Sequence, residues 1–356
     1  MSEVSRRQLI KGAAAVAGSL VLPGAHAAPV QNAKIRVGQI GVGHAHASKL
    51  SVYRSSADYE VVGIVEPNEG LRKRAEGQDP YRDLPWMTTE QLLNEPGLQV
   101  VLVETEVRDL LNTAEVCIAA GKHVHLDKPA GESLIQYQKI LKAAEAAGLM
   151  VQMGYMYRYS PAVMLLRDFL KQGWLGDVFE VHTVMSKVVP ESGRRALAAY
   201  PGGIMFELGC HIIDLVIGIL GAPNTVTAWG QHVSPVRDDL QDNMLAVLQY
   251  EKALASVKSS AVEVDGGSRR HLVVCGTEGT FHIQPLDNPR AQVTLSQSRG
   301  DYRKGAQEIE FPKYSRYVGD AADMAKIIRG EKQCDFSYAH DFDVQKTVLE
   351  ASGVKQ

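Results

Sequence analysis

The chain has 356 residues, of which 45% are hydrophobic, and its formal net charge is −3 at pH 7. This length is enough for about two domains, each with its own core. The sequence contains no basic block and no stripe of interleaved basic and aromatic residues, so nucleic acid is not expected as a partner. The four cysteines are far apart and form no CxxC pair, which argues against a zinc site and against a dense disulfide framework.

The first 27 residues have the three regions of an export signal. Arg6 and Arg7 precede a short apolar run, and Ala25-His26-Ala27 matches an A-x-A cleavage site. The arginine pair indicates the twin-arginine route, and the apolar run is too short to be a stable membrane anchor. We therefore expect a signal peptide at residues 1–27 and a periplasmic or secreted protein that folds, and binds any cofactor, before export.

The start of the mature chain has the pattern of a nucleotide-binding turn. A strand at residues 34–40 runs into GVGHAH at 41–46, and a helix is expected from about Ala45. Two glycines two positions apart allow a tight turn and let the backbone approach a pyrophosphate closely, at the positive end of the helix. His46 stands where this fingerprint has its third glycine.

The acidic residue of the fingerprint is Glu66, at the end of a strand at 59–65. A carboxylate at this point binds a ribose 2′-hydroxyl and would repel a 2′-phosphate, so it favours NAD over NADP. Arg72, Lys73 and Arg74 follow soon after and keep NADP possible, although a solvated helix face explains them better.

Two further strands end in charged residues. An apolar run at 100–103 leads into ETE at 104–106, and a strand at 122–126 leads into DKP at 127–129. Ligands of open α/β sheets bind at the carboxyl ends of the strands. A lysine beside a carboxylate at such a strand end is therefore a charged group placed where a ligand would bind. Strands and helices alternate throughout, which predicts a doubly wound, NAD(P)-binding Rossmann domain at residues 28–150.

Beyond this domain, two segments carry residues that suit a ligand. Tyr155, Tyr157 and Arg158 form a polar, aromatic cluster that suits a sugar or another polyhydroxyl ligand, although interdomain packing explains the cluster equally well. A helix closed by Gly221 carries Glu207, His211 and Asp214 at i, i+4 and i+7, on one face. Three ionisable groups on one stripe of an apolar helix are costly unless they are used, which favours a functional role.

The segment from 224 to 283 reads mostly as strands joined by hairpin turns. This pattern predicts an open sheet, and the far face of such a sheet needs cover. We therefore expect the protein to form oligomers.

Four segments together resemble the glucose–fructose oxidoreductase, inositol dehydrogenase and rhizopine-catabolism (Gfo/Idh/MocA) family: GVGHAH at 41–46, AGKHVHLDKPAGES at 120–133, GYMYRYSP at 154–161 and GGIMFELGCHIIDLVIGILG at 202–221. The resemblance covers essentially the whole mature chain. It implies an N-terminal Rossmann domain with a doubly wound parallel sheet. It also implies a C-terminal α/β domain at 151–356 with an open, mostly antiparallel sheet, which would join the subunits of a dimer or tetramer.

Lys128 matches the lysine of the family's E-K-P motif, which touches both cofactor and substrate, and Asp127 replaces the glutamate. His211 matches the catalytic histidine of D-x-G-x-H, and Glu207 replaces its aspartate. The family's T-P-N-x-x-H loop is absent, since Leu110 occupies the position of its histidine.

From these matches we expect three catalytic residues, namely Lys128, His211 and Glu207. The expected cofactor-binding residues are Gly41, Gly43, His44, Ala45, His46, Glu66, Thr105, Asp127, Lys128 and Pro129. The expected substrate-binding residues are Tyr155, Tyr157, Arg158 and Asp214. No set of histidine, cysteine and carboxylate ligands has metal spacing, so we expect no metal.

The leading hypothesis is hydride transfer between NAD, or NADP, and a carbinol carbon of a sugar, polyol or glycoside. His211 would be the general base, Glu207 would orient its imidazole, and Lys128 would stabilise negative charge on the reacting oxygen. Free NAD is scarce outside the cytoplasm, so we expect a tightly bound cofactor. One alternative is a redox-neutral glycosidase or lyase in which bound NAD oxidises the substrate transiently. A second alternative is a non-catalytic protein that binds a sugar or a nucleotide.

Overall fold

The structure is a computed structural model and describes residues 33–354. The signal peptide expected at residues 1–27 lies outside the described residues. Within the described part, no helix is both long enough and apolar enough to span a membrane.

The N-terminal half is built on a six-stranded sheet with the order β3-β2-β1-β4-β5-β6, in which neighbouring strands are parallel. This is the strand order of the Rossmann fold, and the order reverses between β1 and β4. The strands are β1 (Ile35–Ile40), β2 (Tyr59–Val65), β3 (Trp86–Met87), β4 (Leu98–Val103), β5 (His123–Leu126) and β6 (Val151–Met153). The sixth strand lies beyond residue 150, where we expected the domain to end.

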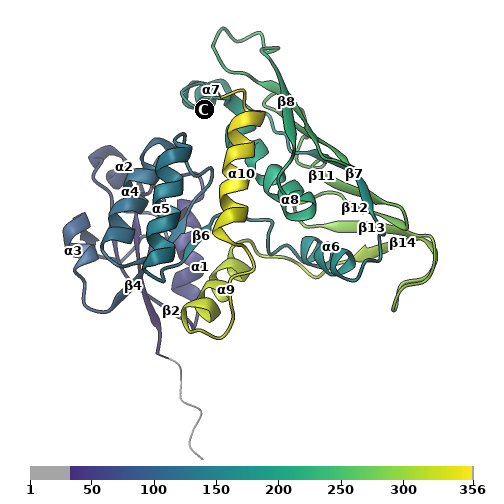
Figure 1. Ribbon diagram of the computed structural model, residues 1–356. Coiled ribbons are helices and arrows are strands. Elements are labelled where there is room, and N and C mark those ends of the chain that lie inside the picture. Colours follow the sequence, from purple (N-terminus) through teal and green to yellow (C-terminus); the bar gives the residue numbers. More distant parts are fainter. Residues whose placement is uncertain (1–32, 355–356) are drawn as a thin grey trace, which may run out of the picture. The chain divides into compact units, whose positions relative to one another are not determined.

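Helices cover both faces of this sheet (Figure 1). In β4, Val101 and Val103 belong to the core on the side of the longer helices, whereas Val100 and Leu102 belong to the core on the opposite side. Burial on both faces explains why the strand is an almost unbroken apolar run. The helical segments of this half are η1 (Ala47–Lys49), α1 (Leu50–Ser55), α2 (Glu69–Ala75), α3 (Thr89–Leu93), α4 (Val107–Ala119) and α5 (Leu134–Ala146).

The helix that follows the glycine turn begins later than expected. A bend and a short 3₁₀ segment (Ala47–Lys49) precede α1, which has only six residues. The backbone N–H of His46 donates to Nδ1 of His44 over 3.2 Å. Such a local side-chain acceptor competes with helix formation, which explains the delayed start.

The C-terminal half is built on an eight-stranded sheet with the order β14-β13-β12-β11-β7-β10-β9-β8. The pair β7–β10 is parallel and the other pairs are antiparallel. The strands are β7 (Val178–Val184), β8 (Thr225–Gln231), β9 (Asn243–Gln249), β10 (Leu254–Ser260), β11 (His271–Gly276), β12 (Gly279–Ile283), β13 (Arg290–Leu295) and β14 (Gly305–Glu310). The expected mixed fold class is therefore confirmed, with two strands more than the sequence indicated.

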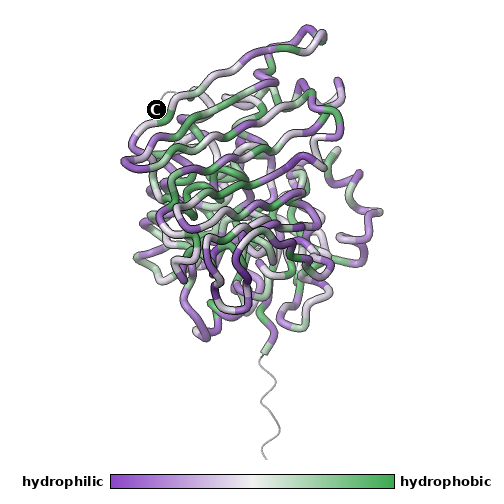
Figure 2. The backbone as a smooth tube through the Cα atoms, turned by 90° about the vertical axis from the view of Figure 1, so that its right-hand side faces the viewer, coloured by the Kyte–Doolittle hydropathy of each residue, from purple (hydrophilic) through white to green (hydrophobic). Residues whose placement is uncertain are grey.

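One face of the second sheet is covered and the other is open. The helical segments of this half are α6 (Pro161–Lys171), α7 (Glu191–Ala198), η2 (Met205–Gly209), α8 (Cys210–Leu220), α9 (Val318–Ile328) and α10 (Tyr338–Ala351). Helices α6 and α8 lie on the inner face (Figure 1). In the view turned by 90°, hydrophobic and hydrophilic residues alternate along the strands of this sheet (Figure 2). Trp229 and Leu254, on β8 and β10, are 53% and 55% exposed.

The chain returns to the first sheet near its end. Ala321 and Met324 of α9 pack in one apolar cluster with Ile35, Leu50 and other residues of the N-terminal half. The hydroxyl of Tyr59 donates to the carbonyl oxygen of Ala321 over 2.7 Å. The nucleotide-binding half thus includes a late helix that sequence order alone did not assign to it.

Candidate active site

The glycine turn after β1 passes close to the end of β4. Gly41 has a φ of +95°, and a Cβ atom on it would lie 2.4 Å from the backbone nitrogen of Thr105. Only glycine fits this conformation and this close approach. The turn therefore places bare backbone at the carboxyl edge of the sheet, as a pyrophosphate requires.

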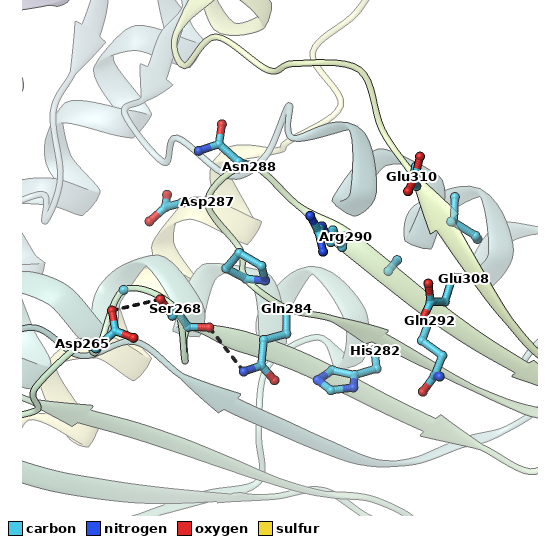
Figure 3. A pocket seen from close by; sticks show the side chains of 14 residues that line it. Asp265, Ser268, His282, Gln284, Asp287, Asn288, Arg290, Gln292, Glu308 and Glu310 are labelled. Carbon is cyan, nitrogen blue, oxygen red and sulfur yellow. Dashed lines mark hydrogen bonds between the residues drawn. The ribbon is translucent and has the colours of Figure 1, made fainter.

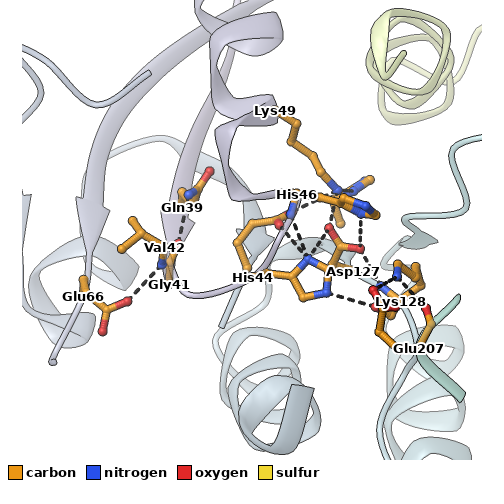
Figure 4. Close-up of polar contacts among 12 residues, drawn as sticks. Gln39, Gly41, Val42, His44, His46, Lys49, Glu66, Asp127, Lys128 and Glu207 are labelled. Carbon is orange, nitrogen blue, oxygen red and sulfur yellow. Dashed lines mark hydrogen bonds and ion pairs between the residues drawn. The ribbon is translucent and has the colours of Figure 1, made fainter. Parts of the chain in front are cut away.

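Glu66 closes the other side of this turn. One carboxylate oxygen accepts a hydrogen bond from the backbone N–H of Val42 over 2.9 Å (Figure 4). The other accepts from the backbone N–H of Asn68, also over 2.9 Å. Glu66 and Thr105 line a pocket of about 480 Å³. The Thr105 hydroxyl is buried without a hydrogen-bond partner in the described part of the chain. The residues present thus fit the adenosine half of a dinucleotide, with Glu66 placed for a ribose hydroxyl.

A buried polar network surrounds Asp127 at the end of β5 (Figure 4). One oxygen accepts from the backbone N–H of Lys128 over 2.7 Å and lies 3.2 Å from Nδ1 of His46. The other oxygen lies 2.6 Å from the ammonium of Lys49 and 3.2 Å from Nδ1 of His44. His44 reaches the same strand end again, because its Nε2 lies 3.0 Å from the carbonyl oxygen of Lys128.

Lys49 is the cation of this network, and the sequence analysis did not predict it as a site residue. Its ammonium is buried and also lies 3.1 Å from a carboxylate oxygen of Glu104 and 2.8 Å from Nε2 of His125. Burial raises the pKa of Glu104 well above its usual range, and the nearby Asp127 carboxylate adds to this rise. Burial also acts to raise the pKa of Asp127, but His44 and Lys49 outweigh it and hold that pKa well below normal. The Lys49 ammonium thus pairs with the Asp127 carboxylate at 2.6 Å, and burial disfavours a negative charge on the neighbouring Glu104.

Two groups of side chains have donor atoms close enough to hold a metal ion. They are His44 with His46 and Asp127, and Glu104 with His125 and Asp127, with donor atoms within 4.8 Å of one another. Asp127 is common to both groups and is already paired with the Lys49 ammonium. A cation at this place is thus supplied by the chain itself, and the absence of a metal stays a prediction.

Lys128 connects the first sheet to the segment that carries His211. Its ammonium donates to the carbonyl oxygen of Glu207 over 2.8 Å and lies 3.5 Å from the Glu207 carboxylate. Lys187 approaches the same carboxylate to 3.3 Å. Burial acts to raise the pKa of Glu207, but Lys128 and Lys187 outweigh it and lower that pKa to about 2.

The expected alignment of Glu207 with His211 is not present. Residues 205–209 form a π-helix, and α8 begins only at Cys210. Glu207 thus belongs to the π-helical turn, whereas His211 belongs to the α-helix that follows it. The Glu207 carboxylate faces Lys128 and Lys187, and within the described chain no hydrogen bond joins it to His211. The predicted orienting role of Glu207 is therefore not supported by the geometry.

His211 lies in an aromatic cage. The rings of Tyr157 and His46 are centred 5.8 Å from its ring and that of Tyr155 lies at 6.1 Å. Burial lowers the pKa of His211 well below its ordinary value, and the Lys128 charge lowers it further. The imidazole is therefore neutral at neutral pH, which is the form that a general base requires.

Arg158 and Asp214 lie in a buried ion cluster instead of facing a ligand. The Arg158 guanidinium is 2.6 Å from a carboxylate oxygen of Asp214 and 2.6 Å from one of Asp341, and all three side chains are buried. Two carboxylates satisfy this guanidinium, and a substrate carboxylate or hydroxyl would have to displace one of them. The substrate-binding role expected for Arg158 and Asp214 has no support in this geometry. Tyr155 and Tyr157 do lie at the site, beside His211.

The loop at 311–317 completes the site and was also missed from the sequence. Tyr317 has a left-handed backbone (φ +68°), and its ring lies 5.8 Å from the ring of His46 and 5.0 Å from the Lys49 ammonium. Arg316 pairs with Asp287, which also accepts a hydrogen bond from Tyr157 over 3.0 Å. Arg316 and Asp287 are 29 positions apart and the other pairs more than a hundred, so no local pattern predicts these contacts.

Such a turn at the carboxyl edge of such a sheet is typical of dinucleotide-binding domains. Residues 35–155 match the NAD-binding Rossmann fold of the oxidoreductase family, and residues 163–282 match the GFO/IDH/MocA C-terminal domain. The chain belongs to the Gfo/Idh/MocA family. The resemblance of the four sequence segments is thereby confirmed, as is a nicotinamide dinucleotide as the cofactor class.

Characterised relatives are similar to parts of the chain. Scyllo-inositol 2-dehydrogenase (NADP⁺) of Bacillus subtilis is 24% identical over 62% of this chain and 62% of its own length. Trans-1,2-dihydrobenzene-1,2-diol dehydrogenase of Sus scrofa is 26% identical over 54% of this chain and 57% of its own length. The matches thus span about three fifths of these two relatives.

Solved structures share the fold over most of the described chain. An NAD-binding oxidoreductase from Klebsiella pneumoniae has a TM-score of 0.78 at 19% identity, covering 90% of this chain and 96% of its own. An oxidoreductase from Agrobacterium radiobacter, solved with NAD⁺, L-tartaric acid and magnesium, has a TM-score of 0.77 at 18% identity, covering 90% and 97%. Identities this low establish the fold alone.

Proposed function

We propose that the protein moves a hydride between NAD and a carbinol carbon of a sugar, polyol or glycoside. One observation carries the proposal. Lys128 is bonded through its carbonyl oxygen to His44 of the nucleotide turn, at 3.0 Å, and through its ammonium to the segment that leads into His211, at 2.8 Å. A single residue thus joins the cofactor turn to the general base. The dehydrogenase names of the relatives from Bacillus subtilis and Sus scrofa support this reaction class.

In the mechanism, the bound nicotinamide supplies the hydride acceptor. The neutral imidazole of His211 takes the hydroxyl proton, and the Lys128 ammonium stabilises negative charge on the reacting oxygen. Tyr155 and Tyr157 keep water away from the imidazole and hold its ring in place. Glu66 selects the ribose hydroxyl of NAD, although NADP stays an alternative that a titration with both nucleotides decides.

The reaction is tested by the near-ultraviolet absorbance of reduced nicotinamide. NAD-loaded protein is mixed with scyllo-inositol, myo-inositol, D-glucose, methyl β-D-glucoside and D-gluconate, and the absorbance is followed with time. We expect at least one of these polyols to produce a lasting rise. A protein that binds NAD but reduces it with none of them would contradict the proposed substrate class.

A redox-neutral glycosidase or lyase is the second candidate, because the site holds a second imidazole. His46 lies beside His211 and is held by Asp127 at 3.2 Å. Elimination next to a transient ketone needs a base for the C–H proton in addition to the base for the hydroxyl. Release of methanol from methyl β-D-glucoside without a lasting absorbance change would favour this path over net oxidation.

We further propose export by the twin-arginine route and assembly of the protein into a dimer or tetramer. The arginine pair and the cleavage pattern in residues 1–27 support export, and loss of periplasmic protein on changing Arg6 and Arg7 to lysine tests it. The exposed Trp229 and Leu254 on the open sheet support assembly.

A further inference from the structure

Each of two carboxylates beside His211 is shared by two cations. Glu207 lies between Lys128, at 3.5 Å, and Lys187, at 3.3 Å. Asp287 lies between Arg270, at 2.6 Å, and Arg316. The four cations exceed the two carboxylates by two positive charges.

Both groups of charges belong to the reaction site. The Tyr157 hydroxyl donates to Asp287, and its ring packs against His211. Burial is the main cause of the lowered pKa of His211, and Lys128 and Arg270, one from each group, lower it further. The surplus positive charge therefore acts on the atoms that react.

The nucleotide-binding half does not cancel this surplus. Lys49 and Asp127 are paired at 2.6 Å and together carry no net charge. Burial raises the pKa of Glu104 well above its usual range, which disfavours a negative charge there. The surplus positive charge at Glu207 and Asp287 is thus open to an anionic ligand.

Two of the four cations are accessible. The side chains of Arg316 and Lys187 are 42% and 37% exposed, whereas that of Lys128 is 1% exposed. Arg316 precedes Tyr317 on the loop that covers His46. Its partner Asp287 also borders a separate pocket of about 930 Å³ on the second sheet, where it lies, with Asn288, away from Gln292 and Glu308 (Figure 3). An anionic ligand can therefore meet Arg316 and Lys187 from solvent through their exposed parts, whereas Lys128 is enclosed.

We propose that the substrate is an acidic sugar or hydroxy acid, whose carboxylate is bound by Arg316 and Lys187 while a neighbouring hydroxyl faces His211. This inference rests on the oxidoreductase function proposed above and narrows its substrate class. A guanidinium matches a carboxylate in a fork of two hydrogen bonds. A phosphate ester also fits such a fork, so the test below includes D-glucose 6-phosphate.

The test is calorimetric titration of NAD-loaded protein with D-glucuronate, D-galacturonate, D-gluconate, D-glucose and D-glucose 6-phosphate. We expect at least one of the three carboxylates to bind about tenfold more tightly than D-glucose, because a hydrogen bond to a charged group is worth about one decade or more. Added salt should weaken this preference. Equal binding of acids and D-glucose, no binding of any acid, or tightest binding of the phosphate would each overturn the proposal.

Variants of Arg316 and Lys187 test whether these two side chains bind the substrate carboxylate. Arg316→Gln should weaken binding of the acid about tenfold more than binding of D-glucose, whereas Arg316→Lys should keep part of the preference for the acid. Asp287 stays paired with Arg270 in both variants, so the fold has no reason to change. Arg82→Gln, which removes an exposed arginine of the first domain, is the matched control. A preference that survives Arg316→Gln combined with Lys187→Gln would contradict the assignment.

NAD is titrated before the sugars, so that failure of the oxidoreductase function can be told apart from failure of the proposed substrate class. Failure to bind NAD would contradict the oxidoreductase function itself. Normal NAD binding without a preference for acids would contradict the substrate class and leave the oxidoreductase function in place.

Discussion

At the scale of single residues, the site depends on a neutral imidazole placed between charged groups. His211 is surrounded by tyrosine rings, and Lys128 lies near enough to lower its pKa. The sequence motifs named both residues, because lysine after a buried strand and histidine in an apolar helix are visible locally. The motifs also predicted that Arg158 and Asp214 bind substrate, whereas the structure places both in a buried ion cluster with Asp341. This cluster could not be predicted, because Arg158 and Asp341 are distant in the chain.

His211→Asn should abolish most turnover and leave nucleotide binding intact. An amide cannot accept the hydroxyl proton, and general-base catalysis is worth about 10²- to 10⁴-fold. The measurement is the rate of nicotinamide reduction in NAD-loaded protein, together with the dissociation constant of NAD. His282→Asn, on strand β12 of the second sheet, is the control and should react at the wild-type rate. Wild-type turnover in His211→Asn would remove this residue from the mechanism.

At the scale of elements, the glycine turn after β1 and the π-helix at 205–209 carry the backbone of the site. The order of strands and helices in the first sheet followed from apolar runs and glycine positions. The π-helix at 205–209 did not, because no residue pattern distinguishes it from a regular helix. The pairing of Glu207 with Lys128 and Lys187 was missed because it joins separate segments of the chain. The last two strands of the second sheet were missed, although burial alternates regularly along β13.

Gly41→Ala should prevent nucleotide binding and lower stability by about 1–3 kcal/mol, the usual cost of a strained non-glycine conformation. A Cβ atom there would lie 2.4 Å from the Thr105 nitrogen. Gly148→Ala is the matched control, since Gly148 also has a positive φ (+64°) but open space around its Cα. Both variants are compared by NAD titration and by urea unfolding. Equal NAD affinity in Gly41→Ala and the wild type would contradict the placement of the pyrophosphate.

At the scale of the whole molecule, long-range contacts complete both the core and the site. Helix α9 returns to the first sheet, and the loop before it places Tyr317 over Lys49 and His46. Sequence order assigned this stretch to the second half, because nothing in its composition shows where it packs. Its helix carries Asp320, whose carboxylate oxygens are buried without a hydrogen-bond partner in the described chain.

Asp320 should make stability depend on pH. Burial raises its pKa to about 7, against about 3.9 in an unfolded chain. Between these values the folded state holds a proton that the unfolded chain has released, so stability falls as pH rises through this window. Asp320→Asn should be more stable than the wild type by about 1–4 kcal/mol near pH 8 and differ less near pH 5.

This pH dependence is measured by thermal unfolding of the wild type, of Asp320→Asn and of Asp301→Asn, which changes an exposed aspartate. The wild type and Asp301→Asn should lose melting temperature together between about pH 5 and about pH 8, and Asp320→Asn should lose less. Parallel losses in all three proteins would show that Asp320 is ionised throughout.

Assembly through the open sheet should depend on its exposed apolar residues. Trp229→Asp places a charge where a second copy would bury the ring, so light scattering should give a smaller mass than for the wild type. Trp229 pairs with Leu245 on β9, which is also exposed. Val264→Asp, at an 84% exposed position outside the strands, should leave the mass unchanged. A monomeric wild type would contradict assembly altogether.

The central claim is that the glycine turn, Glu66 and Lys128 hold a nicotinamide dinucleotide against His211. The most direct measurement is mass spectrometry of the small molecules released by denaturing freshly purified protein, followed by NAD titration of whatever fraction is empty. We predict NAD or NADH in a stoichiometric amount, retained through gel filtration and taken up again by emptied protein. Protein that carries no nucleotide and takes none up at millimolar supply would contradict the account.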